Sequence, residues 1–381
     1  MRQIIISDSH TSQNIDFIYN FIRDSLLKKI KIDFIVLNGD ILGEDKARPG
    51  YGYKYDKEMF LFNFKKNELL QKLVPEIAQG IIKYKEIYKN NGQFSDDEQI
   101  ELAKLIKSYI QTRYDFLYST LKKFSELVPT LYNLGTYESP IHYKTINELA
   151  FLMNLKPTLL KKIALLENYR FVYHDFIKKI KGLEGKKFRN ISGNAILIKN
   201  VILAGIPGFH DSSVPMDSQS ELQEKMTKDL LDSIKRQLTY ADHLIIYNHC
   251  DCKKMKNPFS IRPGSPLIRQ FIGEMKGKLK HKIFIQSYNH WVTTHFYERD
   301  EFNFILNNTA VNNCIFNIVE VSNKIRCFDV DPKQNRVREL NKYDSFTAEY
   351  TTSEQRLALN YKNPDEIIEQ RNLKGCYYMS F

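Results

Sequence analysis

Long apolar runs and CxxC cysteine pairs are missing from this 381-residue chain. No apolar stretch approaches the roughly 20 residues that a membrane-spanning helix needs. The five cysteines are sparse and odd in number, and none has the CxxC spacing of a zinc knuckle. The first residues already read as a strand, so no signal peptide is expected. These absences favour a cytoplasmic protein with reduced thiols and no membrane span.

Acidic residues are scarce in two segments, although the chain as a whole carries 45 of them against 56 Lys and Arg. Residues 156–199 hold eleven basic and three acidic side chains, which leaves a net charge of +8. Residues 253–282 hold nine basic side chains and one acidic, again a net +8. Such segments predict attraction of an anionic, phosphate-containing substrate. Nucleic acid is not favoured as the partner, because a lysine-rich and asparagine-rich composition explains the charge equally well.

Apolar residues make up 43% of the chain and aromatic residues 13%, which is ample for a large core. No internal repeat and no linker divides the sequence. We therefore expect one domain over residues 1–335, followed by a polar extension, residues 336–381, packed on that domain.

The first two expected strands both end in groups that bind metals. Residues 2–6 form a short β-branched strand that runs into Asp8 and His10. After a helical stripe, residues 32–37 form a second strand that ends in Asn-Gly and Asp40. A parallel crossover would place the three side chains at the same sheet edge. Carboxylate with imidazole is a ligand set for Zn, Mn or Fe.

Residues 44–125 interrupt this pattern and predict a helical insertion that covers or flanks the active-site face. Helical periodicity covers residues 57–91 and 96–126, and Ser95 is a plausible N-cap before three acidic residues. The aromatic loop at residues 50–55 either packs the insertion down or stacks on a base or sugar.

The remaining strands also end in polar groups. Further strands are expected at residues 128–134, 194–198, 201–205, 243–249 and 282–290, with antiparallel closing strands at 302–309, 314–321 and 324–330. The 194–198 and 201–205 strands form a hairpin, and residues 217–239 form a helix. Candidate ligands follow three of the strands, at Glu138, His249 and His290.

Five blocks in this order resemble those of the calcineurin-like metallophosphoesterase superfamily. The blocks are Asp8-Ser9-His10, Gly39-Asp40, Gly135-Thr136-Tyr137-Glu138, the lone His249, and Ser287-Tyr288-Asn289-His290. The third and fifth depart from the family's Gly-Asn-His and Gly-His-x-His patterns, so the chain resembles a divergent member. The resemblance implies an α/β fold, a two-sheet sandwich layered α/β/β/α, here with a helical insertion.

The same resemblance implies two metal sites, of which the first is whole. Its ligands would be Asp8, His10, Asp40 and His290. The second site would share Asp40 and use His249, while Thr136 and Tyr288 stand where the family has Asn and His. Because hydroxyl groups are poor neutral ligands, these two substitutes would leave the second site impaired. Tyr137 stands where the family has its catalytic histidine.

The implied activity is hydrolysis of a phosphomonoester or phosphodiester by a metal-activated water, with one or two Mn, Fe or Zn ions. Asp40, His249 and Tyr137 would be the catalytic residues, and His210 with Asp211 would border the substrate. One alternative is a weakened or inactive pseudo-phosphoesterase that acts as a binding scaffold. A further alternative is a nuclease of the same superfamily, suggested by the net charge.

Overall fold

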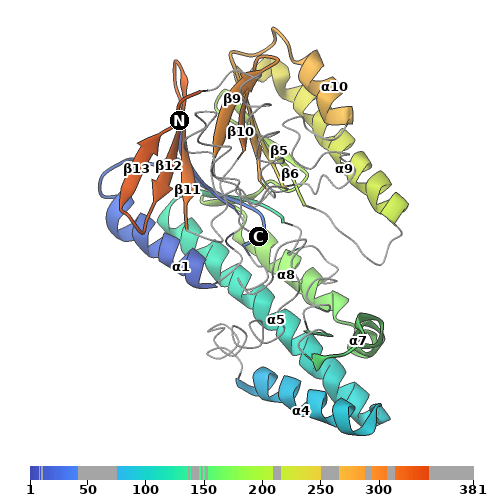
Figure 1. Ribbon diagram of the computed structural model, residues 1–381. Helices are drawn as coiled ribbons and strands as arrows, with labels where there is room; N and C mark the ends of the chain where they lie inside the picture. Colours follow the sequence, from blue (N-terminus) through green and yellow to red (C-terminus); the bar gives the residue numbers. More distant parts are fainter. Residues whose placement is uncertain are drawn as a thin grey trace, which may run out of the picture.

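Two mixed β-sheets with helices on their outer faces make up the described part of the chain (Figure 1). The computed structural model describes residues 1–7, 9, 12–41, 75–135, 138, 146, 149–150, 153–208, 216–249, 266–287, 294–306 and 314–342. This arrangement confirms the α/β class and the two sheets.

The first sheet has seven strands in the order β13-β12-β11-β1-β2-β3-β4. Their bounds are β1 Arg2–Ile6, β2 Phe34–Asn38, β3 Thr130–Asn133, β4 Phe188–Asn190, β11 Phe316–Val321, β12 Ile325–Asp331 and β13 Arg336–Glu339. Strands β1 to β4 are mutually parallel, as the predicted crossover requires, and β11 to β13 are antiparallel. The sheet extends through β13, beyond the expected domain boundary at residue 335.

The second sheet has six strands in the order β5-β6-β7-β8-β10-β9. Their bounds are β5 Ala195–Ile198, β6 Val201–Ile206, β7 His243–Asn248, β8 His281–Gln286, β9 His295–Arg299 and β10 Phe302–Leu306. The β5–β6 hairpin is confirmed, with Lys199 in its turn at φ 56°.

One predicted strand direction is partly wrong. Residues 302–309 were expected to close the sheet as an antiparallel strand, but β10 pairs parallel to β8 and antiparallel only to β9. The prediction left out β9. Because β9 adds one reversal of the chain before β10, β10 returns in the direction of β8.

Apolar side chains fill the space between the sheets. Ile5, Val36 and Leu131 of the first sheet belong to one buried cluster with Ile245 and Ile283 of the second. Because side chains alternate along a strand, the opposite faces of both sheets remain to be covered by helices. This is the physical basis of an α/β/β/α layering.

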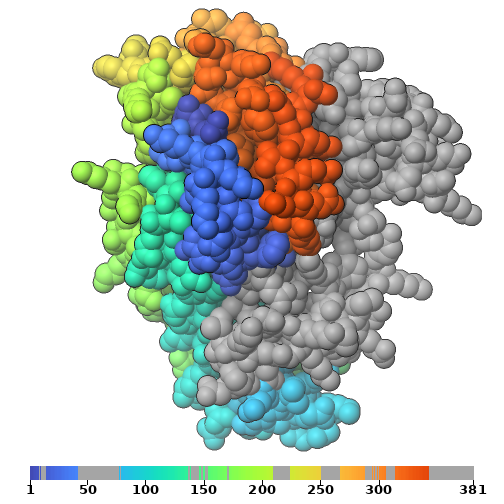
Figure 2. All heavy atoms as spheres, turned by 90° about the vertical axis from the view of Figure 1, so that its left-hand side faces the viewer, coloured from blue at the N-terminus to red at the C-terminus, as the bar shows by residue number. Residues whose placement is uncertain are grey.

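Helices cover the outer face of each sheet. On the seven-stranded sheet they are α1 Ser12–Phe21, with its π-helical end η1 Ile22–Leu26, the C-terminal part of α5 Asp96–Leu127, and α8 Arg170–Leu183. Helix α7 Pro157–Ala164 and the 3₁₀ turn η2 Leu165–Glu167 pack against α5. Helices α9 Met216–Gln237 and α10 Pro266–Glu274 cover the six-stranded sheet. Figure 2 shows α1, in blue, between α5 and the C-terminal strands.

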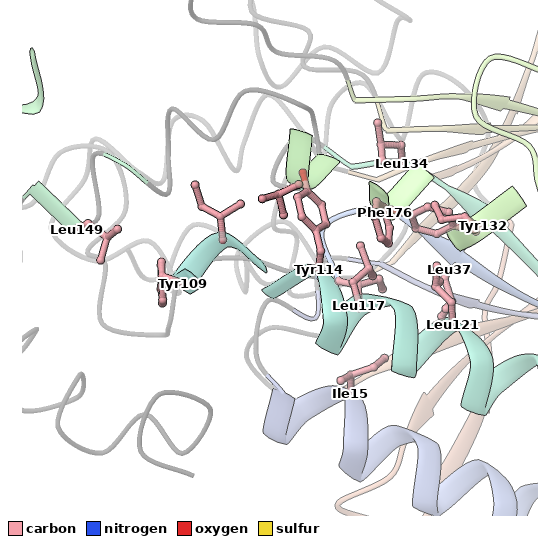
Figure 3. Close-up of a cluster of buried hydrophobic side chains, with 14 of the residues drawn as sticks. Ile15, Leu37, Tyr109, Tyr114, Leu117, Leu121, Tyr132, Leu134, Leu149 and Phe176 are labelled. Carbon is pink, nitrogen blue, oxygen red and sulfur yellow. The ribbon is translucent and has the colours of Figure 1, made fainter. Parts of the chain in front are cut away.

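The long helix α5 joins the predicted insertion to the main core. Leu117 and Leu121 in its C-terminal half are buried in the same cluster as Leu37 of β2 and Tyr132 of β3 (Figure 3). Phe124, nearer the C-terminus of the helix, belongs to the same cluster. Its N-terminal part extends away from the sheets and packs against α4 Pro75–Asn91 (Figure 1). The C-terminal half of α5 is therefore the crossover helix between β2 and β3.

No described helix is long and apolar enough to cross a membrane. Cys314 and Cys327 are buried free thiols.

The N-cap predicted at Ser95 is confirmed at the N-terminus of α5, and it forms a capping box with Glu98. The Ser95 hydroxyl accepts from the Glu98 amide at 3.3 Å, and the Glu98 carboxylate accepts from the Ser95 amide at 2.7 Å. We expect Ser95→Ala to lower the free energy of unfolding by about 1 kcal/mol, because the Glu98 amide at the helix end loses its side-chain acceptor. Urea denaturation measures this change. Ser108→Ala, at an exposed mid-helix position, is the matched control and should not destabilise; equal losses would contradict the capping role.

A stacked histidine pair lies at the start of β7 and β8, at the opposite strand ends from the site described below. The rings of His243 and His281 are 5.1 Å apart and nearly parallel. Burial, and next the neighbouring His281, lower the pKa of His243 below its ordinary value of 6.5. As pH falls, His243 therefore takes up a proton more readily in the unfolded state than in the folded state. Its contribution to the free energy of unfolding is complete above pH 6.5 and is lost as pH falls from there through the folded pKa.

His243→Gln should flatten this acid-side loss in a series of urea denaturations at falling pH. His174→Gln, at an exposed position on α8, should leave the pH profile of the wild type unchanged. An unchanged profile for His243→Gln would show that other groups govern acid stability.

Candidate metal centre

Asp40 and His249 form a fully buried pair at the carboxyl edge of the two sheets. Asp40 follows β2 of the first sheet, and His249 follows β7 of the second. The His249 Nε2 atom lies 3.1 Å from Asp40 Oδ2, and neither side chain is exposed to solvent. A carboxylate and an imidazole that the sequence separates by about two hundred residues are thus brought into contact, as the resemblance implies for the shared ligand and its neighbour.

A backbone carbonyl fixes which nitrogen of His249 faces Asp40. The His249 Nδ1 atom lies 2.7 Å from the carbonyl oxygen of Asn38. A carbonyl can only accept, so Nδ1 carries the hydrogen and donates it. If the ring is neutral, the Nε2 lone pair then faces a carboxylate oxygen. Either a proton or a cation must lie between them to make that contact favourable.

The donor set fits a transition-metal ion. Ligand oxygen and nitrogen atoms lie about 2.1 Å from such an ion, so two neighbouring ligands stand about 3 Å apart. The observed separation of 3.1 Å between Asp40 Oδ2 and His249 Nε2 meets this condition. A metal-binding histidine typically donates its other ring N–H to a carbonyl or carboxylate, as His249 does to Asn38.

Two glycines allow the loops after β2 and β3 to touch. Gly39 has φ +80°, and a Cβ there would lie 2.5 Å from the His249 ring. A Cβ on Gly135 would lie 2.0 Å from the Asp40 amide nitrogen and 2.4 Å from its carboxylate. Asp40 itself is held at φ 50°, a left-handed conformation that is unusual for a residue with a side chain. Any side chain at position 135 would displace the Asp40 carboxylate.

Hydrogen bonds to the Glu138 carboxylate hold these two loops together. One carboxylate oxygen, Oε2, accepts from the amide of Gly135 at 2.5 Å and from the amide of Asp40 at 3.1 Å. The side chain is fully buried. The sequence suggested Glu138 as a potential ligand, but the structure shows its carboxylate hydrogen-bonded to the backbone that presents Asp40. Its role is to position that backbone.

Buried tyrosines surround the Glu138 segment. The Tyr114 hydroxyl, from α5, donates to the Glu138 carbonyl oxygen at 3.3 Å. Burial, and further the Glu138 charge, raise the pKa of Tyr132 well above its ordinary value. Burial likewise raises the pKa of Tyr114, and raises that of Tyr173 to about 12. These hydroxyls stay protonated at neutral pH, so Tyr114 remains a donor to the loop.

Amide side chains join the two sheets immediately below the pair. Asn133, the last residue of β3, donates through Nδ2 to Asn38 Oδ1 at 2.9 Å and to the Ile206 carbonyl at 3.0 Å. Asn38 in turn donates to the Ser287 hydroxyl at 2.6 Å, beside the end of β8. Asn133 and Asn38 therefore hold the carboxyl ends of both sheets in register, and Asn38 also presents the carbonyl that orients His249.

Sequence reasoning missed Asn38 and Asn133 as site residues. A signal was available, because each is the last residue of an otherwise apolar strand, next to a glycine turn. A polar side chain at that position faces the sheet edge where ligands bind.

The other predicted site residues lie outside the described residues. They are Asp8, His10, Thr136, Tyr137, His210, Asp211, Tyr288 and His290. Ser9 is described, and its hydroxyl donates to the Ile41 carbonyl at 3.3 Å, so the loop after β1 contacts the loop after β2. Within the described ranges no group of three or more His, Cys, Asp or Glu side chains suited to a metal occurs.

No protein-family model matches this chain, and no curated protein matches it. Among solved structures, the chain is similar to "GAP50 the anchor in the inner membrane complex of Plasmodium", with 12% identity over 92% of this chain and 94% of that chain. The TM-score is 0.37. At that level the similarity supports no conclusion about this chain.

Gly135→Ala should destabilise the protein by more than about 3 kcal/mol. The added methyl group would overlap the backbone nitrogen and the carboxylate of Asp40, and the buried loops would have to shift to make room for it. Urea denaturation measures the loss. Gly182→Ala on α8 is the matched control, since its Cβ meets nothing within 4 Å and alanine favours the helix. A well-folded Gly135→Ala protein would contradict the close contact between the two loops.

Proposed function

We propose that this chain is a divergent metal-dependent phosphoesterase that hydrolyses a phosphomonoester or a phosphodiester. The observation that carries the proposal is the buried Asp40–His249 pair, whose 3.1 Å separation suits two ligands of one ion. Its place at the carboxyl ends of strands from two stacked sheets supports the finer fold assignment, a metallophosphoesterase sandwich with a helical insertion.

Asp40 and His249 would hold the ion through Oδ2 and Nε2, and the resemblance adds Asp8, His10 and His290 as further ligands. Mn, Fe or Zn suits this mixture of carboxylate and imidazole. When bound, such ions lower the pKa of water and neutralise phosphoryl oxygens.

The chain's own residues prepare the site for that chemistry. The Asn38 carbonyl keeps His249 in the tautomer whose Nε2 faces Asp40. Glu138 and the two loop glycines hold the Asp40 backbone in a conformation it would not adopt alone. Full burial of the pair lowers the local dielectric, so a cation held there would attract an anionic substrate oxygen more strongly than in water.

Proton donation to the leaving group would fall to Tyr137, whose ordinary pKa of about 10 suits that task poorly at neutral pH. General acid catalysis is typically worth about 10²–10⁴-fold in rate. We therefore expect slow turnover, or turnover restricted to good leaving groups. His210 and Asp211 would contact the substrate, and Thr136 and Tyr288 would supply weak ligands for a second ion.

Asp40→Asn should abolish hydrolysis of an activated aryl phosphodiester in the presence of Mn, Fe or Zn. The variant should also retain less metal after gel filtration, measured by elemental analysis, because a neutral amide replaces the anionic ligand. Asp232→Asn on α9 is the matched control, since its carboxylate lies 3.9 Å from Lys235 in a surface pair that contributes little.

Full activity of Asp40→Asn would contradict the site assignment. Metal binding by the wild type without hydrolysis of any mono- or diester would instead favour the pseudo-phosphoesterase scaffold. If the wild type neither binds metal nor hydrolyses any ester after metal loading, the proposed enzyme is contradicted altogether.

A further inference from the structure

Large apolar side chains are exposed at the corner where α7 and η2 turn into α8. Leu165 is 47% exposed, Leu166 56% and Phe171 61%. They are three of the nine large apolar residues exposed in the described chain, and they fall within seven positions of each other. Single exposed apolar residues are ordinary, but such a concentration on one turn indicates a binding surface. We refer to Leu165, Leu166 and Phe171 as the apolar corner.

The apolar corner is held rigidly by its neighbours. Ile163 and Tyr169, on either side of the leucines, are almost fully buried against the core. Glu167, between them, pairs with Lys107 of α5 at 3.3 Å. The buried residues anchor the turn, so the three exposed side chains are not needed to hold it in place.

Lysines share the face of the apolar corner. Residues three and four apart on a helix are neighbours, so Lys161 and Lys162 at the end of α7 lie beside Leu165 and Leu166. Neither lysine forms an ion pair with any described residue. Their segment, residues 156–199, carries a net charge of 11 − 3 = +8 out of the chain's total of +11. Along the sequence, the acidic residues nearest the corner are Glu167, which is paired with Lys107, and Asp175.

We propose that the apolar corner and its lysines bind the surface of an anionic lipid bilayer. Leucine and phenylalanine would enter the boundary between headgroups and acyl chains, while the lysines reach the headgroup phosphates. Nucleic acid would use the positive charge but leave the leucines without a partner. Helix α7, from which the corner begins, lies away from the sheets and beside α5 (Figure 1).

The proposal is independent of the metal centre, and it is tested by co-sedimentation of the full chain with vesicles. We expect binding to vesicles that contain about one third phosphatidylserine in phosphatidylcholine, weaker binding to phosphatidylcholine alone, and release by about 0.5 M salt. Leu165→Ser with Leu166→Ser keeps the charge and should lower the partition constant about tenfold, because two apolar anchors are removed. Ile82→Ser on α4, where the isoleucine is 57% exposed, is the matched control and should change it less than about twofold.

Lys161→Gln with Lys162→Gln tests the other half of the surface and should weaken binding to the anionic vesicles alone. Circular dichroism and the urea midpoint show that each variant is folded. Wild-type protein that stays in the supernatant with both vesicles would overturn the proposal. An equal loss of vesicle binding in the leucine variant and in Ile82→Ser would also overturn it. So would light scattering that shows the wild type to self-associate and the leucine variant not to.

Discussion

The contact between the loops after β2 and β3 is the constraint on which the candidate site depends. Gly135 lies so close to the Asp40 backbone that no side chain fits between them. One carboxylate oxygen of Glu138 accepts hydrogen bonds from the backbone amides of both loops, at Asp40 and Gly135. The strained, left-handed Asp40 is held because several groups determine its position together. A carboxylate presented in this way has little freedom left to lose when it binds a cation.

The polar residues below the site extend this constraint across the sandwich. The apolar faces of two sheets can slide past each other at modest cost, because burial by itself has no direction. Hydrogen bonds from Asn133 and Asn38 have direction, and they connect β3 and β2 to the ends of β6 and β8. They select one relative position of the sheets, in which His249 meets Asp40.

Helix α5 connects this centre with the periphery. Its C-terminal half covers the seven-stranded sheet, and Tyr114 in its middle donates to the Glu138 carbonyl. Seven residues earlier, about two helical turns away, Lys107 pairs with Glu167 at the apolar corner. The segment predicted as an insertion is thus partly a crossover helix of the main domain. The sequence did not distinguish the two, because a long amphipathic helix has the same apolar pattern whether it packs on a sheet or on another helix.

By itself the sequence determined the strands that end in Asp40 and His249, the β5–β6 hairpin and the Ser95 cap, because short-range periodicity and turn chemistry decide these features. It could not place β9 or the direction of β10, which depend on pairing between distant segments. Nor could it distinguish Glu138 as a positioning residue from Glu138 as a ligand, since both roles suit a buried carboxylate. Only the tertiary structure decided that role, by bringing the amides of Gly135 and Asp40 to the same oxygen.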